Sequence, residues 1–77
     1  MYTYNVEKYA DTKVFENTCY KILANAENST LGKRFFDVDG TQYQLINTPG
    51  GKITVVNDYE VDAVYVDSEV NLDKIFS

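Results

Sequence analysis

The side chains with the clearest chemical potential are the carboxylates and phenols of the last third of the chain. Asp58, Glu60 and Asp62 alternate along the sequence, and Asp67 and Glu69 repeat that spacing. We expect such a row to share one face of a strand, because successive strand side chains point to opposite faces. Acidic and aromatic groups together can hold Lys and Arg through charge and cation–π contacts. The predicted partner-binding residues are Asp58, Tyr59, Glu60, Asp62, Tyr65, Asp67 and Glu69.

The net charge of −5 is concentrated in the same part of the chain. Residues 1–52 hold six acidic and six basic side chains, which cancel, whereas residues 53–77 hold six acidic side chains and one basic one. This asymmetry predicts a negative surface that binds a protein partner with a basic surface. The alternative is a solvated acidic strand edge that keeps the protein soluble and discourages edge-to-edge pairing.

The residue types argue against an enzyme. The sequence contains no histidine, so it lacks the commonest general base and metal ligand. Cys19, the single cysteine, falls on the apolar side of a predicted helix, where a small core residue is expected. Asp37-Val38-Asp39-Gly40 begins like a calcium loop, but the later ligand positions are missing. We therefore predict no catalytic residues, no cofactor and no metal site.

Composition also narrows the setting in which the protein acts. One arginine and six lysines among 77 residues disfavour direct binding of nucleic acid, which needs clustered basic groups. No apolar stretch is long enough to span a membrane, and the first residues do not resemble a signal peptide. A single cysteine suits a reducing compartment. We expect one domain, residues 1–77, in the cytoplasm, without membrane contact.

One helix is predicted over residues 12–27. Asp11 precedes it at the position of an N-cap, where a carboxylate accepts from free backbone N–H groups. Asn28 and Ser29, followed by Gly32, supply stop signals. The apolar side chains recur at helical spacing and form one stripe that should pack on a core. They are Phe15, Cys19, Ile22, Leu23 and Ala26.

Period-two alternation predicts five strands, over residues 2–7, 34–38, 41–46, 52–56 and 59–67. Asp39-Gly40 between two of them predicts a hairpin with a two-residue loop, in which Val38 pairs with Thr41 and Phe36 with Tyr43. Residues 68–77 fit either a further strand or a short helix. The predicted hairpin has one face under the helix (Val38, Phe36, Tyr43 and Leu45) and one facing water (Asp37, Phe35, Gln42 and Gln44).

These elements give an α+β fold class, with one helix packed on a four- to five-stranded antiparallel sheet. The order along the chain is strand, helix, then four strands, which resembles the cystatin/monellin arrangement of a helix across a curled sheet. The resemblance implies an architecture only, because Gln42-Tyr43-Gln44-Leu45-Ile46 does not match the protease-binding motif of cystatins.

Two functions compete at this point. The first is a small acidic binding module that occludes a basic groove on a nucleic-acid-handling host protein, as phage-encoded DNA mimics and anti-CRISPR inhibitors do. The second is a self-associating structural or regulatory subunit. In that case a homodimer would bury the two-sided apolar strand 59–67 and the apolar tail with Leu72, Ile75 and Phe76.

Overall fold

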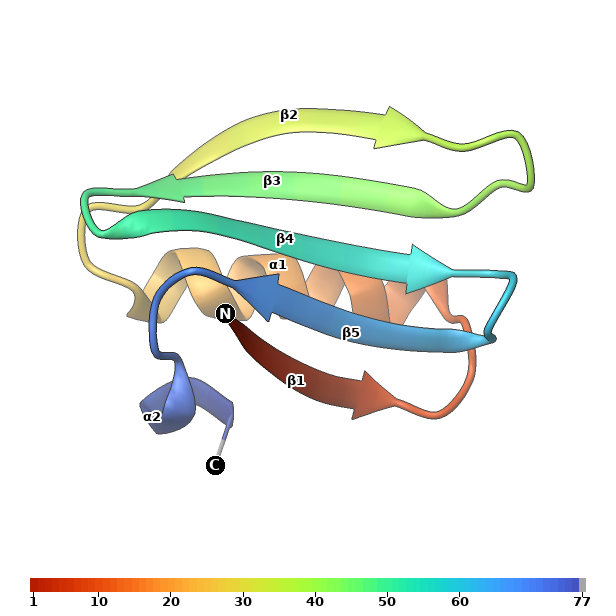
Figure 1. Cartoon of the computed structure of the whole chain (residues 1–77), viewed down its shortest axis with the longest axis horizontal. Coiled ribbons are helices and arrows are strands. Elements are labelled where there is room, and N and C mark those ends of the chain that lie inside the picture. The colour runs from red at the N-terminus through yellow and green to blue at the C-terminus, as the bar shows by residue number, and fades with distance from the viewer. Residues whose placement is uncertain (77) are drawn as a thin grey trace.

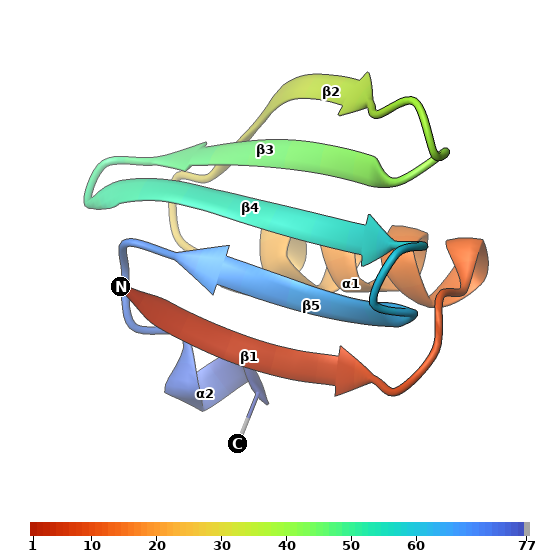
Figure 2. The same ribbon diagram turned by 45° about the vertical axis from the view of Figure 1, so that its right-hand side comes forward.

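The computed structural model describes residues 1–76 and has one sheet with a helix across one face (Figures 1 and 2). The strands are β1 (Tyr2–Glu7), β2 (Thr30–Phe36), β3 (Gln42–Thr48), β4 (Gly51–Asp58) and β5 (Ala63–Ser68). The helices are α1 (Thr12–Asn25) and α2 (Asp73–Phe76). Neighbouring strands are antiparallel, in the order β1-β5-β4-β3-β2, so β1 and β2 form the two edges. The predicted α+β class and element order are confirmed.

Helix α1 forms where its cap and apolar stripe predict. The Asp11 carboxylate accepts from the backbone N–H groups of Lys13 at 2.8 Å and Val14 at 3.1 Å, as expected of an N-cap. The helix ends at Asn25, two residues before the predicted end, because Ala26 takes an extended conformation. No helix within residues 1–76 is both long and apolar enough to cross a membrane.

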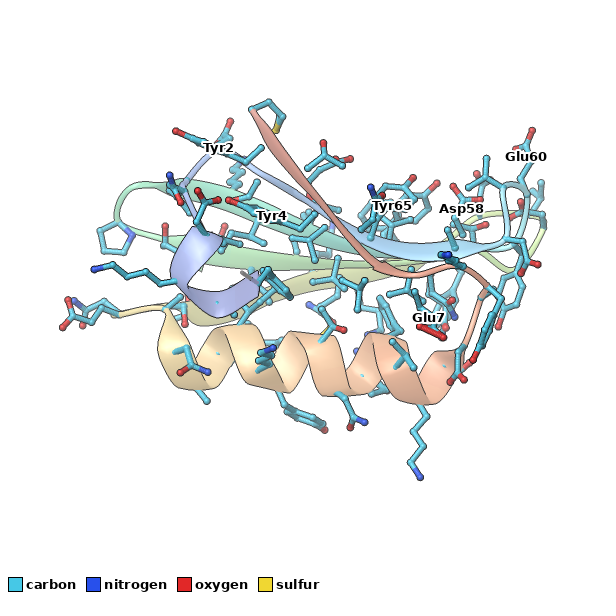
Figure 3. The ribbon with its side chains drawn as sticks, turned by 90° about the horizontal axis from the view of Figure 1, so that it is seen from below. Tyr2, Tyr4, Glu7, Asp58, Glu60 and Tyr65 are labelled. Carbon is cyan, nitrogen blue, oxygen red and sulfur yellow. The ribbon has the colours of Figure 1, made fainter. Side chains whose placement is uncertain are left out.

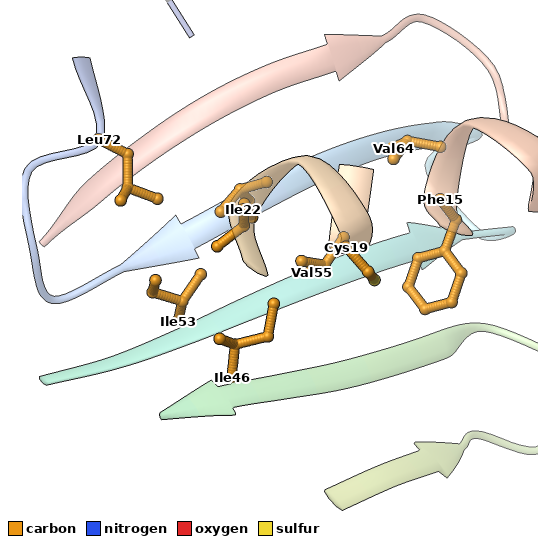
Figure 4. Packing of buried hydrophobic residues seen from close by; sticks show 9 residues of the cluster. Phe15, Cys19, Ile22, Ile46, Ile53, Val55, Val64 and Leu72 are labelled. Atoms are coloured by element: carbon orange, nitrogen blue, oxygen red, sulfur yellow. The ribbon is translucent and has the colours of Figure 1, made fainter. Parts of the chain in front are cut away.

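The core lies between α1 and the face of the sheet that it covers (Figure 4). Phe15, Cys19 and Ile22 of the predicted stripe are buried there, whereas Leu23 and Ala26 are half-buried at its margin. The sheet and the chain after it contribute the remaining buried apolar side chains, which are Ile46, Ile53, Val55, Val64, Val66 and Leu72.

The predicted register of the β2–β3 hairpin is wrong by one residue. Phe36 pairs with Gln42 and Phe35 with Tyr43, so residues 37–41 form a longer loop in place of a two-residue turn. The Asp37 N–H donates to the Thr41 carbonyl, and Gly40 closes the loop with a φ of 90°. A shift of one residue exchanges the faces of a strand. Gln44 is therefore buried under α1, and Tyr43 lies on the opposite face.

The predicted strand over residues 59–67 begins too early. β5 starts at Ala63, and residues 59–62 form the turn from β4. The Asp58 carboxylate accepts from the Glu60 and Val61 N–H groups at 2.9 and 3.1 Å, and Asp62 has a φ of 58°. Side chain–backbone bonds of this kind favour turns over strands. Asp58, Glu60 and Asp62 therefore do not share a strand face.

The C-terminal segment packs on its own chain. Residues 73–76 form α2, the helical alternative of the two that the sequence left open. The Leu72 N–H donates to the Tyr4 hydroxyl, which donates to Asp73 at 2.7 Å. Leu72 is 4% exposed, and the Phe76 ring stacks on Tyr4. The apolar tail residues predicted to meet a second copy, Leu72, Ile75 and Phe76, thus pack against their own core; Ser77 lies outside the described residues.

Candidate functional site: the outer face of the sheet

The face of the sheet opposite to α1, here called the outer face, carries a row of large side chains across four strands. Phe35 of β2 pairs with Tyr43 of β3, Tyr43 with Val56 of β4, and Val56 with Tyr65 of β5. The Phe35 and Tyr43 rings stack with centroids 4.8 Å apart and planes 11° apart. Cross-strand neighbours of this kind pack on each other and stabilise the sheet. We call these four residues the aromatic row.

The aromatic row is packed although no helix covers it. Val56 is only 2% exposed on the outer face, because its cross-strand neighbours Tyr43 and Tyr65 flank it. Tyr43 and Tyr65 are half-buried, whereas Phe35 is 43% exposed at the edge. The result is a firm apolar surface that needs little side-chain ordering before it can meet a partner.

Carboxylates lie beside the aromatic row, most of them at the end of the sheet that holds the β2–β3 loop and the β4–β5 turn (Figure 1). The Tyr65 hydroxyl donates to Asp58 Oδ2 at 3.1 Å, and Figure 3 shows both side chains on the side of the sheet away from α1. Burial, the bond to Asp58 and the charge of Asp67 raise the pKa of Tyr65 to about 12. Burial also raises the pKa of Tyr43, and nearby carboxylates add to this shift. Five carboxylates raise the pKa of Tyr43 or Tyr65, and we call them the acidic rim. They are Asp37, Asp39, Asp58, Glu60 and Asp67.

The structure brings together four of the seven residues predicted to bind a partner. Asp58, Tyr65 and Asp67 belong to the outer face, and Glu60 stands beside it in the β4–β5 turn (Figure 3). Tyr65 belongs to the aromatic row and the other three to the acidic rim. Their grouping rests on strand pairing rather than on the alternation seen in the sequence.

The other three predicted residues serve the fold. The Tyr59 hydroxyl lies 3.4 Å from Thr12 Oγ1, at the start of α1. Asp62 Oδ1 accepts from the Ala10 N–H at 2.8 Å and so ties the loop before α1 to the β4–β5 turn. Glu69 Oε1 accepts from the Lys52 N–H at 2.7 Å, at the opposite end of β4. These contacts hold loops in place and leave the residues outside the acidic rim.

Sequence reasoning missed the β2–β3 half of the outer face. The predicted register faces Phe35 to water and Tyr43 to the core, so it does not predict that their rings stack. The sequence predicts Asp37 on the water-facing side of a strand and Asp39 in the hairpin turn, without a role for either in binding. Asp39 does serve the turn, since it accepts from the Thr41 N–H at 2.9 Å, and that bond lowers its pKa. The longer loop over residues 37–41 places Phe35 and Tyr43 together on the outer face.

Buried polar contacts fix the sheet that carries the aromatic row. Gln44 Oε1 accepts from Arg34 Nε at 2.7 Å, and Gln44 Nε2 donates to the carbonyls of Gly32 and Leu45. The Arg34 guanidinium stacks over Phe15 and pairs with Glu16 at 2.6 Å. Every buried side-chain nitrogen and oxygen within residues 1–76 has a partner. The inner face is thus saturated, and its polar groups support the fold.

Other places are weaker candidates. Burial raises the pKa of the Cys19 thiol to about 11, so it stays protonated at neutral pH and is a poor nucleophile. Within residues 1–76, no three His, Cys, Asp or Glu side chains cluster as metal ligands would. The hollow between the end of α1, the β3–β4 turn and α2 is lined by both apolar and polar side chains, and of the polar ones Asn25 donates to the Lys21 carbonyl of its own helix.

Comparison of the chain with protein-family models, with curated proteins and with solved structures gave no significant match. The function must therefore be inferred from the chemistry of the outer face.

Proposed function

We propose that this protein is a binding module whose outer face docks a basic segment of a partner protein. The observation that carries the proposal is the aromatic row with the acidic rim beside it. The net charge of −5 attracts a basic partner over distance, and the acidic rim is the surface that this partner would contact. The proposed contact residues are Phe35, Tyr43, Val56 and Tyr65 with Asp37, Asp39, Asp58, Glu60 and Asp67.

The chemistry of the row suits arginine in particular. A guanidinium can lie flat on a tyrosine or phenylalanine ring and form paired hydrogen bonds with a carboxylate at the same time. Tyr43 and Tyr65 lie two strands apart in the sheet, with the buried Val56 between them, and the Tyr65 hydroxyl donates to Asp58. Rigid rings of this kind are typical of protein-binding hot spots.

A nucleic-acid-handling protein is the more specific form of the proposed partner. Such proteins present Lys and Arg in grooves that normally hold phosphates. An acidic surface with few basic groups would occupy such a groove and block it. In this form the module acts as an inhibitor in the cytoplasm, and a phage-encoded inhibitor of the DNA-mimic or anti-CRISPR type is its most specific version.

The proposal is tested by titrating the isotopically labelled protein with a short peptide of alternating arginine and serine, followed by NMR. We expect saturable shifts of the backbone amides of β3, β4 and β5 around Tyr43, Val56 and Tyr65. A peptide with glutamate in place of arginine is the control and should cause none. Shifts centred on α1 or on the hollow near α2, or shifts that never saturate, would refute the proposal.

A further inference from the structure

β2 and the loop after it hold four of the exposed apolar side chains of the described chain. Leu31 is 61% exposed, Phe35 43%, Phe36 63% and Val38 104%. β2 pairs with β3 on one side and forms an edge of the sheet on the other (Figure 1). Sheet edges that are long and apolar recruit another strand unless they are protected. The opposite edge, β1, is anchored to α2 by the contacts of Tyr4 with Leu72 and Asp73.

The backbone of β2 directs a short run of hydrogen-bonding groups away from β3. In an antiparallel pair, residues alternately bond to the partner strand and point away from it. Asp37 donates to the Thr41 carbonyl, so Asp37 bonds toward β3. By alternation Phe35, opposite Tyr43, also bonds toward β3, while Arg34 and Phe36 present their N–H and C=O groups to the open edge. A bulge between Leu31 and Arg34 ends this regular stretch.

These features fit a second copy of the chain. We propose that the protein forms a symmetric dimer in which two β2 strands pair antiparallel across a two-fold axis at Phe35. In this register Arg34 of each copy faces Phe36 of the other, which gives four backbone hydrogen bonds. Phe35 then meets its own counterpart in a non-hydrogen-bonded pair, and two sheets join into one.

Charge complementarity supports this register. When Phe35 faces Phe35, continuing the register by one residue beyond the regular stretch at each end places Lys33 of each copy opposite Asp37 of the other, so two opposite-charge pairs flank the aromatic contact. A register centred on Lys33 or on Asp37 would instead place like charges opposite each other. The dimer does not depend on the proposed function, although it would join two aromatic rows end to end at Phe35.

Sedimentation of the purified protein alone, at rising concentrations up to about 1 mM, tests the dimer without any partner. We expect a concentration-dependent dimer, which K33D and D37K should each weaken by about tenfold, because each change places like charges opposite each other twice per dimer. The double variant K33D/D37K should regain the wild-type affinity. K8D, which makes the same charge change before α1, should have no effect.

Disulfide trapping tests the register separately. Non-hydrogen-bonded pairs hold their Cα atoms about 4.5 Å apart, within reach of a disulfide. Under oxidised glutathione F35C should therefore form a covalent dimer. K33C should not, because position 33 of one copy faces position 37 of the other and so lies about four residues away from position 33 of that copy. Cys19 is 2% exposed and should stay out of the reaction.

A protein that stays monomeric at about 1 mM would overturn the dimer. A dimer indifferent to K33D, or F35C that does not cross-link, would overturn this interface. Because no peptide is present, each of these outcomes is distinct from failure of the proposed function.

Discussion

Replacing Gln44 by leucine tests the register that creates the outer face. The structure buries Gln44 to 1% exposure, with its amide spread over the carbonyls of Gly32, Lys33 and Leu45 and over Arg34 Nε. The register predicted from sequence places the same side chain in water, where leucine would cost almost nothing. The two registers therefore predict different stabilities for one variant.

The expected loss of stability follows from the bonds. Q44L leaves about two carbonyls without a donor, which costs about 4 kcal/mol, and the added apolar burial returns about 2 kcal/mol. The net loss in the free energy of unfolding is about 2 kcal/mol. For a chain of this size that corresponds to a fall in the urea midpoint of about 2 M, or in Tm of about 8–16 °C.

The assay is urea unfolding followed by circular dichroism, with Leu45→Gln as the matched control. Leu45 is half-buried on the outer face, so its replacement should cost about 1 kcal/mol or less. A Q44L variant as stable as the wild type, together with a strongly destabilised L45Q, would show that β3 has the opposite facing. In that case Tyr43 would not belong to the aromatic row.

Two further variants test the supports of the sheet. The Arg34 bond holds the pKa of Glu16 below its ordinary value of 4.5, so the stabilisation is present above that pH and is lost as the pH falls through the folded-state pKa. Glu16→Gln should therefore lower the urea midpoint at pH 7 and lose this effect in acid; an equal effect at both pH values would contradict it. Leu72→Ala should cost about 3 kcal/mol in urea unfolding because Leu72 is buried, whereas Val38→Ala should cost less than about 0.5 kcal/mol; equal costs would show that the tail is not part of the core.

Local signals were enough to predict the helix and the fold class. The Asp11 cap and the stripe through Phe15, Cys19 and Ile22 are properties of neighbouring residues, and the structure confirms them. The number of strands and their antiparallel pairing follow from period-two runs separated by turn residues. These features need no knowledge of distant contacts.

The register of β2 could not be predicted in this way, because distant contacts decide it. Arg34 must face α1 to stack on Phe15 and pair with Glu16, and this requirement favours the longer loop over the two-residue turn. The Asp39 carboxylate stabilises that loop by accepting from Thr41. The prediction that Asp58, Glu60 and Asp62 share a strand face was wrong for a related reason. A carboxylate that accepts from turn N–H groups gives the same sequence pattern as one on a strand face.

The outer face was consequently predicted only in part. Asp58, Tyr65 and Asp67 were identified from charge and residue type, but the row that unites them depends on pairing among four strands. Tyr59, Asp62 and Glu69 resemble them in sequence and bond elsewhere.

The most direct test of the proposed function compares two charge reversals in binding of the arginine–serine peptide by calorimetry, at low and at high salt. Glu60→Lys changes the acidic rim, whereas Glu27→Lys makes the same charge change at an exposed position in the turn after α1. We predict that Glu60→Lys weakens binding several-fold at low salt, that Glu27→Lys has a much smaller effect, and that high salt reduces the difference. Equal effects of the two reversals would mean that net charge alone attracts the peptide and that the outer face is not its binding site.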